Sequence, residues 1–409
     1  MTPLRPAQAE DSILGVAPRW VAEPATVEEA VETMRGCARD RQRVAFVGGG
    51  TDLGVGAPPA GLDVVLRTGK LARVVEHSPS DQIVVAEAGL PLAALQRTLA
   101  AHGQRLALDP PFAERATVGG IVAANAFGPR RTRHGTARDL IIGLSMVRAD
   151  GVVARGGGKV VKNVAGFDLP RLFVGSLGTL GLITTVTFRL HPLPEASATM
   201  TVARPTGAQA RAVVVALREA QLDPASVTLL AGPDGPSLGV RFEGFGPGVR
   251  QQVERLAGLG PALGLRFDLL DGAGAEAFWA RHELARTSGA VRVRLAAPPS
   301  AVAAVLEGAV GPLTGGLGPG WATFDPWAGA GFAGGTPTDT GSAVEALNRA
   351  RRALVALGGS LTLAAAPPGV RTGFDAWGAP PAAIEVMRRL KARFDPEGRL
   401  APGRFVGGI

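Results

Sequence analysis

The chain has 409 residues, 46% of them hydrophobic and 19% charged, with a formal net charge of +8. This length is typical of two or three domains, and the apolar content excludes a largely disordered chain. The arginines are scattered along the sequence without interleaved aromatic residues, which argues against nucleic-acid binding. No run of 18 or more apolar residues is free of charge and the N-terminus lacks an apolar signal-peptide core, so we expect a cytoplasmic protein that reaches a membrane only peripherally, through partners.

Cysteine and histidine usage restricts the chemistry. The single cysteine, Cys37, lies in the apolar helical pattern of Val27, Val31 and Met34 and is expected to be buried. One thiol cannot form a disulfide within these residues or supply the about four thiolates of an iron–sulfur cluster. The five histidines lie too far apart in the sequence for metal-ligand spacing, so we predict no metal site.

Short elements separated by glycines fill the first part of the chain. Thr26 is expected to cap a helix that has Glu28 and Glu29 in its first turn, and Asp150-Gly151 to form a hairpin turn. The segment His191-Pro192-Leu193-Pro194 is typical of a domain boundary. The predicted helices are 27–39 and 92–101, and the predicted strands are 43–47, 63–66, 83–86, 140–148, 151–155 and 182–190.

Beyond this boundary the pattern changes to longer amphipathic units. A helix at 208–219, strands at 227–230 and 238–242 and a helix at 250–259 are predicted, and this order recurs loosely to about residue 365. The glycine- and proline-rich stretches 311–320 and 328–337 are predicted to be loops.

These patterns predict an α+β protein with an antiparallel sheet in its second part. The predicted domains are residues 1–195, with two subdomains split near residues 75–80, and residues 196–380. Residues 381–409, a helix at 382–393 followed by FDPEGRLAPGR (394–404), are expected to return to the first domain.

Three glycine-rich turns within the first domain could bind phosphate. Glycine lets backbone N–H groups approach an anion closely, and successive N–H groups at a turn or helix start can hold a diphosphate. At Ala116-Thr117-Val118-Gly119-Gly120, Thr117 is expected to cap a helix whose glycines expose their N–H groups. The alternative reading of any single turn is tight packing in a chain with 57 glycines.

Two familiar nucleotide motifs do not match. At Gly158-Lys159, a phosphate-binding loop would need glycine in place of Val153 and Ser or Thr in place of Val160. The turn GGGTD (48–52) does not extend to the GxGxxG pattern of a Rossmann dinucleotide site.

Taken in order, six segments resemble the FAD-binding domain of the vanillyl-alcohol oxidase superfamily, also called the PCMH-type flavin domain. The resemblance covers roughly residues 15–195 and the tail, and the KNVAGFDL segment (162–169) is most similar to the FAD-binding subunits of bacterial glycolate oxidases. The segments are GGGTD (48–52), ATVGGIVAANAFG (116–128), RHGTARDLI (133–141), GGGKVVKNVAGFDL (156–169), SLGTLGLIT (176–184) and FDPEGRLAPGR (394–404).

The resemblance implies a set of FAD-binding residues in these segments. The first two glycine turns would hold the diphosphate, and Lys162, Asn163 and Asp168 would lie nearest the flavin ring, where a lysine stabilises the reduced form. For Lys159 and Lys162, surface charge is the alternative reading. The full set is Val47, Gly48, Gly49, Gly50, Thr51, Asp52, Asp109, Pro110, Ala116, Thr117, Val118, Gly119, Gly120, Ala123, Asn125, Gly128, Lys162, Asn163, Asp168, Gly178, Thr179, Gly181 and Ile183.

The chain departs from the family in two respects. Many members carry a histidine near the first glycine turn that binds the flavin covalently, but Thr51 and Asp52 stand there in this chain, so FAD is expected to be held non-covalently. The 2-hydroxy-acid dehydrogenases of the superfamily carry a His-x-Gly-Asp-Gly-Asn-type segment with a metal ligand and a base, and no such segment follows residue 195. The catalytic residues are therefore unassigned; Arg281 and His282 are weak candidates, with exposed helix residues as the alternative reading.

The resemblance implies an FAD-binding subunit of a glycolate oxidase complex. Its partners would be a related flavoprotein subunit and an iron–sulfur subunit, which pass the electrons from glycolate oxidation onward. Two alternatives stay open: a self-sufficient FAD-dependent 2-hydroxy-acid dehydrogenase, and a non-catalytic scaffold subunit with a degraded flavin site.

Overall fold

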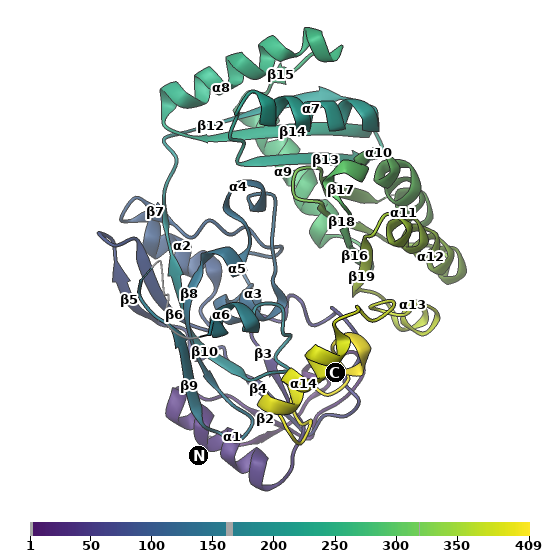
Figure 1. The fold of residues 1–409 in the computed structure, drawn as a ribbon. Helices are drawn as coiled ribbons and strands as arrows, with labels where there is room; N and C mark the ends of the chain where they lie inside the picture. The colour runs from purple at the N-terminus through teal and green to yellow at the C-terminus, as the bar shows by residue number, and fades with distance from the viewer. Residues whose placement is uncertain (1–2, 161–166, 319) are drawn as a thin grey trace. The chain divides into compact units, whose positions relative to one another are not determined.

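The computed structural model describes residues 3–160, 167–318 and 320–409 (Figure 1). The chain divides into two compact units. The first, which we call the cleft unit, comprises Met1–Gly128, Gly135–Leu193 and Ala379–Ile409, and the second, the sheet unit, comprises Pro129–His134 and Pro194–Gly378. None of the helices in the described part of the chain has the length and apolar character needed to cross a membrane.

A small, mostly parallel sheet begins the cleft unit. Its order is β1-β2-β4-β3, in which β4 pairs in parallel with both β2 and β3. Helix α1 (Val27–Arg39) forms as predicted, with the Thr26 side chain accepting a hydrogen bond from the Glu29 N–H. The strands are β1 (Arg5–Pro6), β2 (Trp20–Ala22), β3 (Val44–Val47) and β4 (Val64–Arg67).

The buried face of α1 explains the single cysteine. Ala30, Met34 and Cys37 lie on one side of the helix and pack into a core with Val44 and Leu66 of the sheet. Burial raises the pKa of the Cys37 thiol to about 11, so it stays a protonated, apolar packing residue. The prediction that Cys37 is buried is confirmed.

A five-stranded antiparallel sheet forms the rest of the cleft unit, in the order β5-β6-β10-β8-β9. The predicted hairpin is present, and Gly151 in its turn has a φ of +78° that favours glycine. The strands are β5 (Val74–Ser78), β6 (Ile83–Glu87), β8 (Ile141–Val147), β9 (Val153–Gly157) and β10 (Leu182–Arg189), with β7 (Gln104–Arg105) and β11 (His191–Pro192) paired separately. The helices are α2 (Leu92–Ala100), α3 (Val118–Ala124), α5 (Ala137–Leu140) and α6 (Leu169–Phe173).

The C-terminal segment packs on the first sheet of the cleft unit. The Val44 N–H donates to the Arg399 carbonyl, and the Ala401 N–H donates to the Val44 carbonyl, both at 2.8 Å. Helix α14 (Ile384–Phe394, yellow in Figure 1) and the short helices at Ala9–Asp11 and Val406–Gly408 complete the unit.

The sheet unit is built from two successive βαββαβ repeats that share one antiparallel sheet. In the sheet order β15-β12-β14-β13-β17-β18-β16-β19, each repeat occupies half, and the halves meet where β13 pairs with β17. This order confirms the α+β class and the antiparallel sheet. The strands are β12 (Ala196–Ala203), β13 (Ser226–Gly232), β14 (Gly235–Gly244), β15 (Asp268–Leu269), β16 (Val291–Ala296), β17 (Trp321–Asp325), β18 (Ala330–Gly335) and β19 (Ser360–Ala365).

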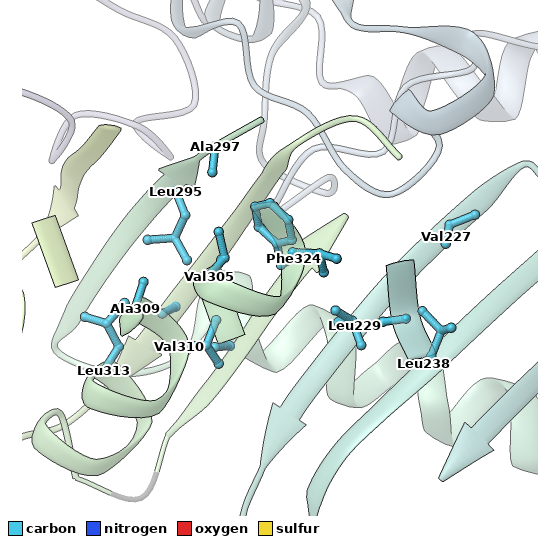
Figure 2. Packing of buried hydrophobic residues seen from close by; sticks show 14 of the residues in the cluster. Val227, Leu229, Leu238, Leu295, Ala297, Val305, Ala309, Val310, Leu313 and Phe324 are labelled. Carbon is cyan, nitrogen blue, oxygen red and sulfur yellow. The ribbon is translucent and has the colours of Figure 1, made fainter. Parts of the chain in front are cut away.

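Helices cover both faces of this sheet. One face packs against α7, α8 and α10–α12 in a large apolar core (Figure 2), whereas α9, which connects the repeats, packs on the other face through Phe278 and Ala285. The helices are α4 (Arg131–His134), α7 (Gly207–Glu219), α8 (Gly246–Leu259), α9 (Gly272–Thr287), α10 (Val302–Val305), α11 (Gly311–Gly316), α12 (Thr340–Ala356) and α13 (Pro368–Gly373), with 3-10 turns at Pro261–Leu263 and Pro299–Ala301 and a π-helical turn at Leu306–Val310.

The two predicted loops in this unit are wrong. Residues 311–316 form α11, and residues 330–335 form β18, a strand buried along its whole length. The glycines of β18 serve close packing rather than a turn: a Cβ at Gly331 would lie 2.0 Å from the Thr323 carbonyl oxygen. Similarly, α11 contains Gly316, where a Cβ would lie 2.3 Å from the Ala346 Cβ of α12.

Candidate functional site

The first glycine turn follows β3 directly. Gly50 adopts a φ of +73°, which reverses the chain after the strand. In the part of the chain that the structure describes, the N–H groups of Gly48, Gly49, Gly50 and Thr51 donate no hydrogen bond to another residue. A run of four half-buried N–H groups that no residue accepts from is suited to binding an anion.

The second glycine segment lies directly against this turn. A Cβ at Gly48 would lie 2.2 Å from the Thr117 hydroxyl oxygen, and one at Gly49 would lie 1.8 Å from the Arg115 carbonyl oxygen. Thr117 caps α3, as predicted, by accepting a hydrogen bond of 3.3 Å from the Gly120 N–H. The glycines at 48 and 49 are therefore required by the close approach of two backbone segments.

The expectation that the glycines of α3 expose their N–H groups is wrong. The Val118 N–H donates to the Leu90 carbonyl at 2.9 Å, and the Gly119 N–H donates to the Ala88 carbonyl at 2.7 Å. A Cβ at Gly119 would lie 2.6 Å from that of Ala88, so this glycine lets α3 pack on the chain that leaves β6. Residues Gly48–Thr51 therefore supply a run of open N–H groups, and α3 supplies a wall.

The third glycine segment leads into β10 and lies beside the end of α3. The Leu177 N–H donates to the Ala123 carbonyl at 2.8 Å. Leu177 and Gly178 have positive φ values of 51° and 76°, which turn the chain toward the cleft.

The three glycine segments line a cleft within the cleft unit that is partly open to solvent. Its volume is about 810 Å³, a figure that includes the open solvent at its mouth. Most of its wall is apolar. The lining residues are Ile13, Ala45, Phe46, Gly48, Gly49, Gly50, Thr51, Asp52, Leu53, Thr68, Ala88, Gly119, Gly120, Ala123, Ala124, Leu177, Gly178, Gly181, Leu182, Ile183, Ala401 and Arg404.

The C-terminal segment supplies the last part of the wall. Arg404 donates two hydrogen bonds of 3.0 Å to the carbonyls of Leu53 and Val55, so it fixes the loop after the first glycine turn. Lys391 of α14 donates to the carbonyls of Thr179 and Leu400 and to the Asp395 carboxylate. Burial lowers the pKa of Lys391. These bonds fasten the tail to the glycine segment before β10.

Eleven predicted residues line the cleft: Gly48, Gly49, Gly50, Thr51, Asp52, Gly119, Gly120, Ala123, Gly178, Gly181 and Ile183. Several others stand just behind it in supporting roles: Thr117 caps α3, Asn125 ends it with a φ of 45°, and the buried Thr179 hydroxyl donates to the Ser176 carbonyl. The other predicted residues that the cleft lining does not include are Val47, Asp109, Pro110, Ala116, Val118, Gly128 and Asp168.

The structure describes only one of the three residues that were predicted to lie nearest the flavin ring. Lys162 and Asn163 lie outside the described residues. Asp168 is exposed and caps α6 by accepting a hydrogen bond from the Arg171 N–H. Lys159 forms an exposed ion pair with Glu76 of β5, as its surface-charge reading implies.

Sequence reasoning missed the apolar wall and the C-terminal contribution. The missed residues are Ile13, Ala45, Phe46, Leu53, Thr68, Ala88, Ala124, Leu177, Leu182, Ala401 and Arg404. A usable signal was present for those inside the recognised segments, which are Ala124, Leu177, Leu182, Ala401 and Arg404. The others lie outside these segments, and only their position next to the turns reveals them.

The lining of the cleft fits a dinucleotide. The open N–H groups of the first turn suit a diphosphate, and the apolar wall suits an aromatic ring. Asn125 Oδ1 and Ser176 Oγ, whose neighbours line the cleft, are buried without a hydrogen-bond partner in the described chain. None of the described cleft-lining residues is a histidine or a cysteine that could attach a flavin covalently.

The weak catalytic candidates lie in the sheet unit, on α9. Arg281 is exposed, whereas His282 is 4% exposed and faces the sheet. Successive helix residues point about 100° apart, so the two side chains do not act as a pair. Burial, together with Arg286 and Arg241, lowers the pKa of His282 well below its usual value.

Comparisons with known families match both ends of the cleft unit. Residues 18–157 match the family described as FAD binding domain, and residues 376–405 match that of the FAD linked oxidases, C-terminal domain.

Curated relatives share about a third of the aligned residues. Glycolate oxidase subunit GlcE of Escherichia coli is 34% identical over 231 residues, which are 56% of this chain and 63% of that protein. The D-lactate dehydrogenase of Archaeoglobus fulgidus is 37% identical over 206 residues, 49% of this chain and 46% of that protein. Glycolate oxidase subunit GlcD of Bacillus subtilis is 33% identical over 183 residues, 45% of this chain and 39% of that protein. The matches therefore span less than two thirds of each relative's own length.

Solved structures share the fold along almost the whole chain. p-Cresol methylhydroxylase superposes with a TM-score of 0.73 over 95% of this chain and 89% of that one, at 17% identity. Alkyldihydroxyacetonephosphate synthase gives 0.72 over 95% of this chain and 78% of that one, also at 17% identity. The predicted resemblance to FAD-linked oxidoreductases and the predicted cofactor, FAD, are confirmed: the chain carries an FAD-binding domain at residues 18–157, and residues 376–405 are similar to the C-terminal domain of the FAD linked oxidases.

Proposed function

We propose that this chain is the FAD-binding subunit of a glycolate oxidase complex and holds FAD non-covalently in the cleft. The observation that carries the proposal is the run of open N–H groups at Gly48–Thr51, closed in by α3. The relatives from Escherichia coli and Bacillus subtilis, named as glycolate oxidase subunits, support the substrate class and the presence of partner subunits.

In this proposal the predicted domains have different functions. Residues 1–195 and 381–409 bind FAD, and residues 196–380 form the second, cap-like domain. Backbone N–H groups of the first turn bind the diphosphate, the apolar wall excludes water from the ring, and Arg404 keeps the loop after the turn in place. When bound, FAD accepts the two electrons that a 2-hydroxy acid releases on oxidation.

Partner subunits complete the proposed reaction. Oxidation of glycolate to glyoxylate releases two electrons and two protons, and a related flavoprotein and an iron–sulfur subunit would carry the electrons onward. In this arrangement the chain reacts with glycolate only when its partners are present. Anaerobic glycolate that bleaches the flavin band of the purified chain alone would favour a self-sufficient dehydrogenase. A colourless chain that FAD does not stabilise would identify a scaffold.

Substitution of Gly49 tests the cleft. In Gly49→Ala, the new Cβ would lie 1.8 Å from the Arg115 carbonyl oxygen, so the turn must move and its N–H groups lose their alignment. We expect the purified variant to lose bound FAD, with affinity reduced at least ~10-fold, the equivalent of about 1.4 kcal/mol.

Gly69→Ala is the matched control for this substitution. No atom lies within 4 Å of a Cβ at Gly69, so this variant is expected to keep its flavin spectrum. Both variants are measured by visible absorption, before and after denaturation, and by titration with FAD. Equal flavin content in the two variants would contradict the proposed role of the first turn.

A further inference from the structure

Arg115 places a positive charge next to the first glycine turn of the cleft unit. The two backbone segments are in contact, because a Cβ at Gly49 would lie 1.8 Å from the Arg115 carbonyl oxygen. The Arg115 side chain reaches the same residue, with Nη2 donating to the Gly49 carbonyl at 3.4 Å. The guanidinium group is therefore held beside the turn whose N–H groups are open.

The backbone of Arg115 is fixed, whereas its side chain is exposed. The N–H groups of Arg115 and Ala116 both donate to the Phe112 carbonyl at 2.9 Å. Among the described residues, the hydrogen bond to Gly49 is the only one that the exposed Arg115 side chain makes. At 3.4 Å it is longer than the usual range of about 2.7–3.2 Å, so the guanidinium group can exchange it for a better acceptor.

The wall of the cleft does not itself supply an excess of positive charge. Among the described residues that line it, the charged ones are Asp52 and Arg404. Arg404 donates to the carbonyls of Leu53 and Val55. Backbone N–H groups offer an anion dipoles but no net charge, whereas each phosphoryl group of a diphosphate linkage is negatively charged. Arg115 adds the full positive charge that the lining lacks.

We propose that Arg115 recruits the cofactor through its diphosphate and then pairs with a phosphoryl oxygen at the turn. This role rests on the proposed binding of FAD in the cleft. The guanidinium group leaves the Gly49 carbonyl, and its planar set of N–H donors matches two oxygens of one phosphoryl group. Because the side chain is exposed, its charge also attracts the anionic coenzyme before contact and speeds association.

A neutral and a charged substitution test this role. At an ionic strength of about 0.01 M, Arg115→Gln should raise the FAD dissociation constant of the flavin-free chain about 10-fold, mainly through slower association. At about 1 M the Debye length falls from ~30 Å to ~3 Å, and the difference should shrink to about 2-fold. Arg115→Lys keeps the charge and should keep most of the affinity and its salt dependence. Stopped-flow quenching of flavin fluorescence measures both rates.

Arg39→Gln is the matched control for the loss of charge. Arg39 is exposed, pairs with Asp40 at the end of α1, and is not part of the cleft lining. The same change there should leave the rate and affinity of FAD binding unchanged at both salt concentrations. Thermal unfolding of the flavin-free proteins checks the fold, and Arg115→Gln should keep the parental midpoint because the altered side chain is exposed.

Comparison of the two glutamine variants decides the role of Arg115. Equal association rates in Arg115→Gln and Arg39→Gln, or a deficit in Arg115→Gln that high salt does not reduce, would overturn it. A salt-dependent deficit that Arg115→Lys restores supports it.

A parent chain that binds no FAD would contradict the proposed function instead. Titration of that protein with ADP, which carries a diphosphate without a flavin, would still decide the role of Arg115. Weaker ADP binding in Arg115→Gln than in Arg39→Gln supports an anion site at the turn. Equal ADP binding, or none by the parent chain, would overturn it.

Discussion

Asp325 is a buried carboxyl group at the end of β17. The Thr132 hydroxyl donates to it at 2.7 Å, and the N–H groups of Trp327 and Ala328 donate to its other oxygen. Burial nevertheless raises its pKa from 3.8 to about 6, against the opposing effect of these hydrogen bonds. The charged form of Asp325 therefore destabilises the folded state at neutral pH.

This residue predicts a pH dependence of stability. Because the pKa is raised in the folded chain, the neutral form favours folding below pH ~4, and this contribution is lost as the pH rises through about 6. The loss is roughly 2–4 kcal/mol at 1.36 kcal/mol per pKa unit. In Asp325→Asn the free energy of unfolding should fall less between pH 4.5 and 7.5 than in the parent chain. Urea unfolding at both pH values measures this, and identical pH dependence in the two proteins would contradict it.

At the scale of elements, Lys391 links α14 to the rest of the cleft unit through hydrogen bonds. Lys391 Nζ lies 2.6 Å from Asp395, whose side chain is fully buried, and donates to Thr179 and Leu400. Asp395 also accepts hydrogen bonds from the N–H groups of Arg399 and Leu400. This network holds the segment that carries Ala401 and Arg404 against the cleft.

Removal of the lysine should loosen both the tail and the cofactor. Breaking a buried ion pair from one side costs about 3–5 kcal/mol, so Lys391→Met should lower the thermal midpoint and raise the FAD dissociation constant. Arg393→Met changes an exposed residue of the same helix and is the control. If both variants keep parental FAD affinity, the tail does not help to hold the cofactor.

The sequence predicted those elements whose signals are local. Helix α1, the cap at Thr117 and the β8–β9 hairpin follow from periodicity, capping residues and a turn dipeptide within a few residues of each other. Strand β18 and helix α11 were missed because each glycine there is required by close contact with a segment distant in the sequence, and no local pattern shows such a contact. The glycine turns of the cleft were found from their local motifs, whereas Ile13 and Phe46 lie in no motif and were not found.

At the scale of the whole molecule, the cofactor should stabilise the fold. A ligand that binds only the native state adds RT ln(1 + [L]/Kd), about 2.7 kcal/mol at a concentration of 100 Kd. Added FAD should therefore raise the thermal midpoint of the chain stripped of flavin. The increase should be smaller in Gly49→Ala than in Gly69→Ala, and equal increases would contradict binding at the first turn.

The cleft unit is discontinuous in the sequence, with the whole sheet unit inserted before its last segment. During synthesis, the glycine turns emerge from the ribosome long before Ala401 and Arg404, which close the same cleft. Tight capture of the coenzyme must therefore wait until translation has passed through the inserted unit. We therefore expect flavin loading to follow synthesis of the segment that carries Ala401 and Arg404, and chains that end before this segment should lack bound flavin.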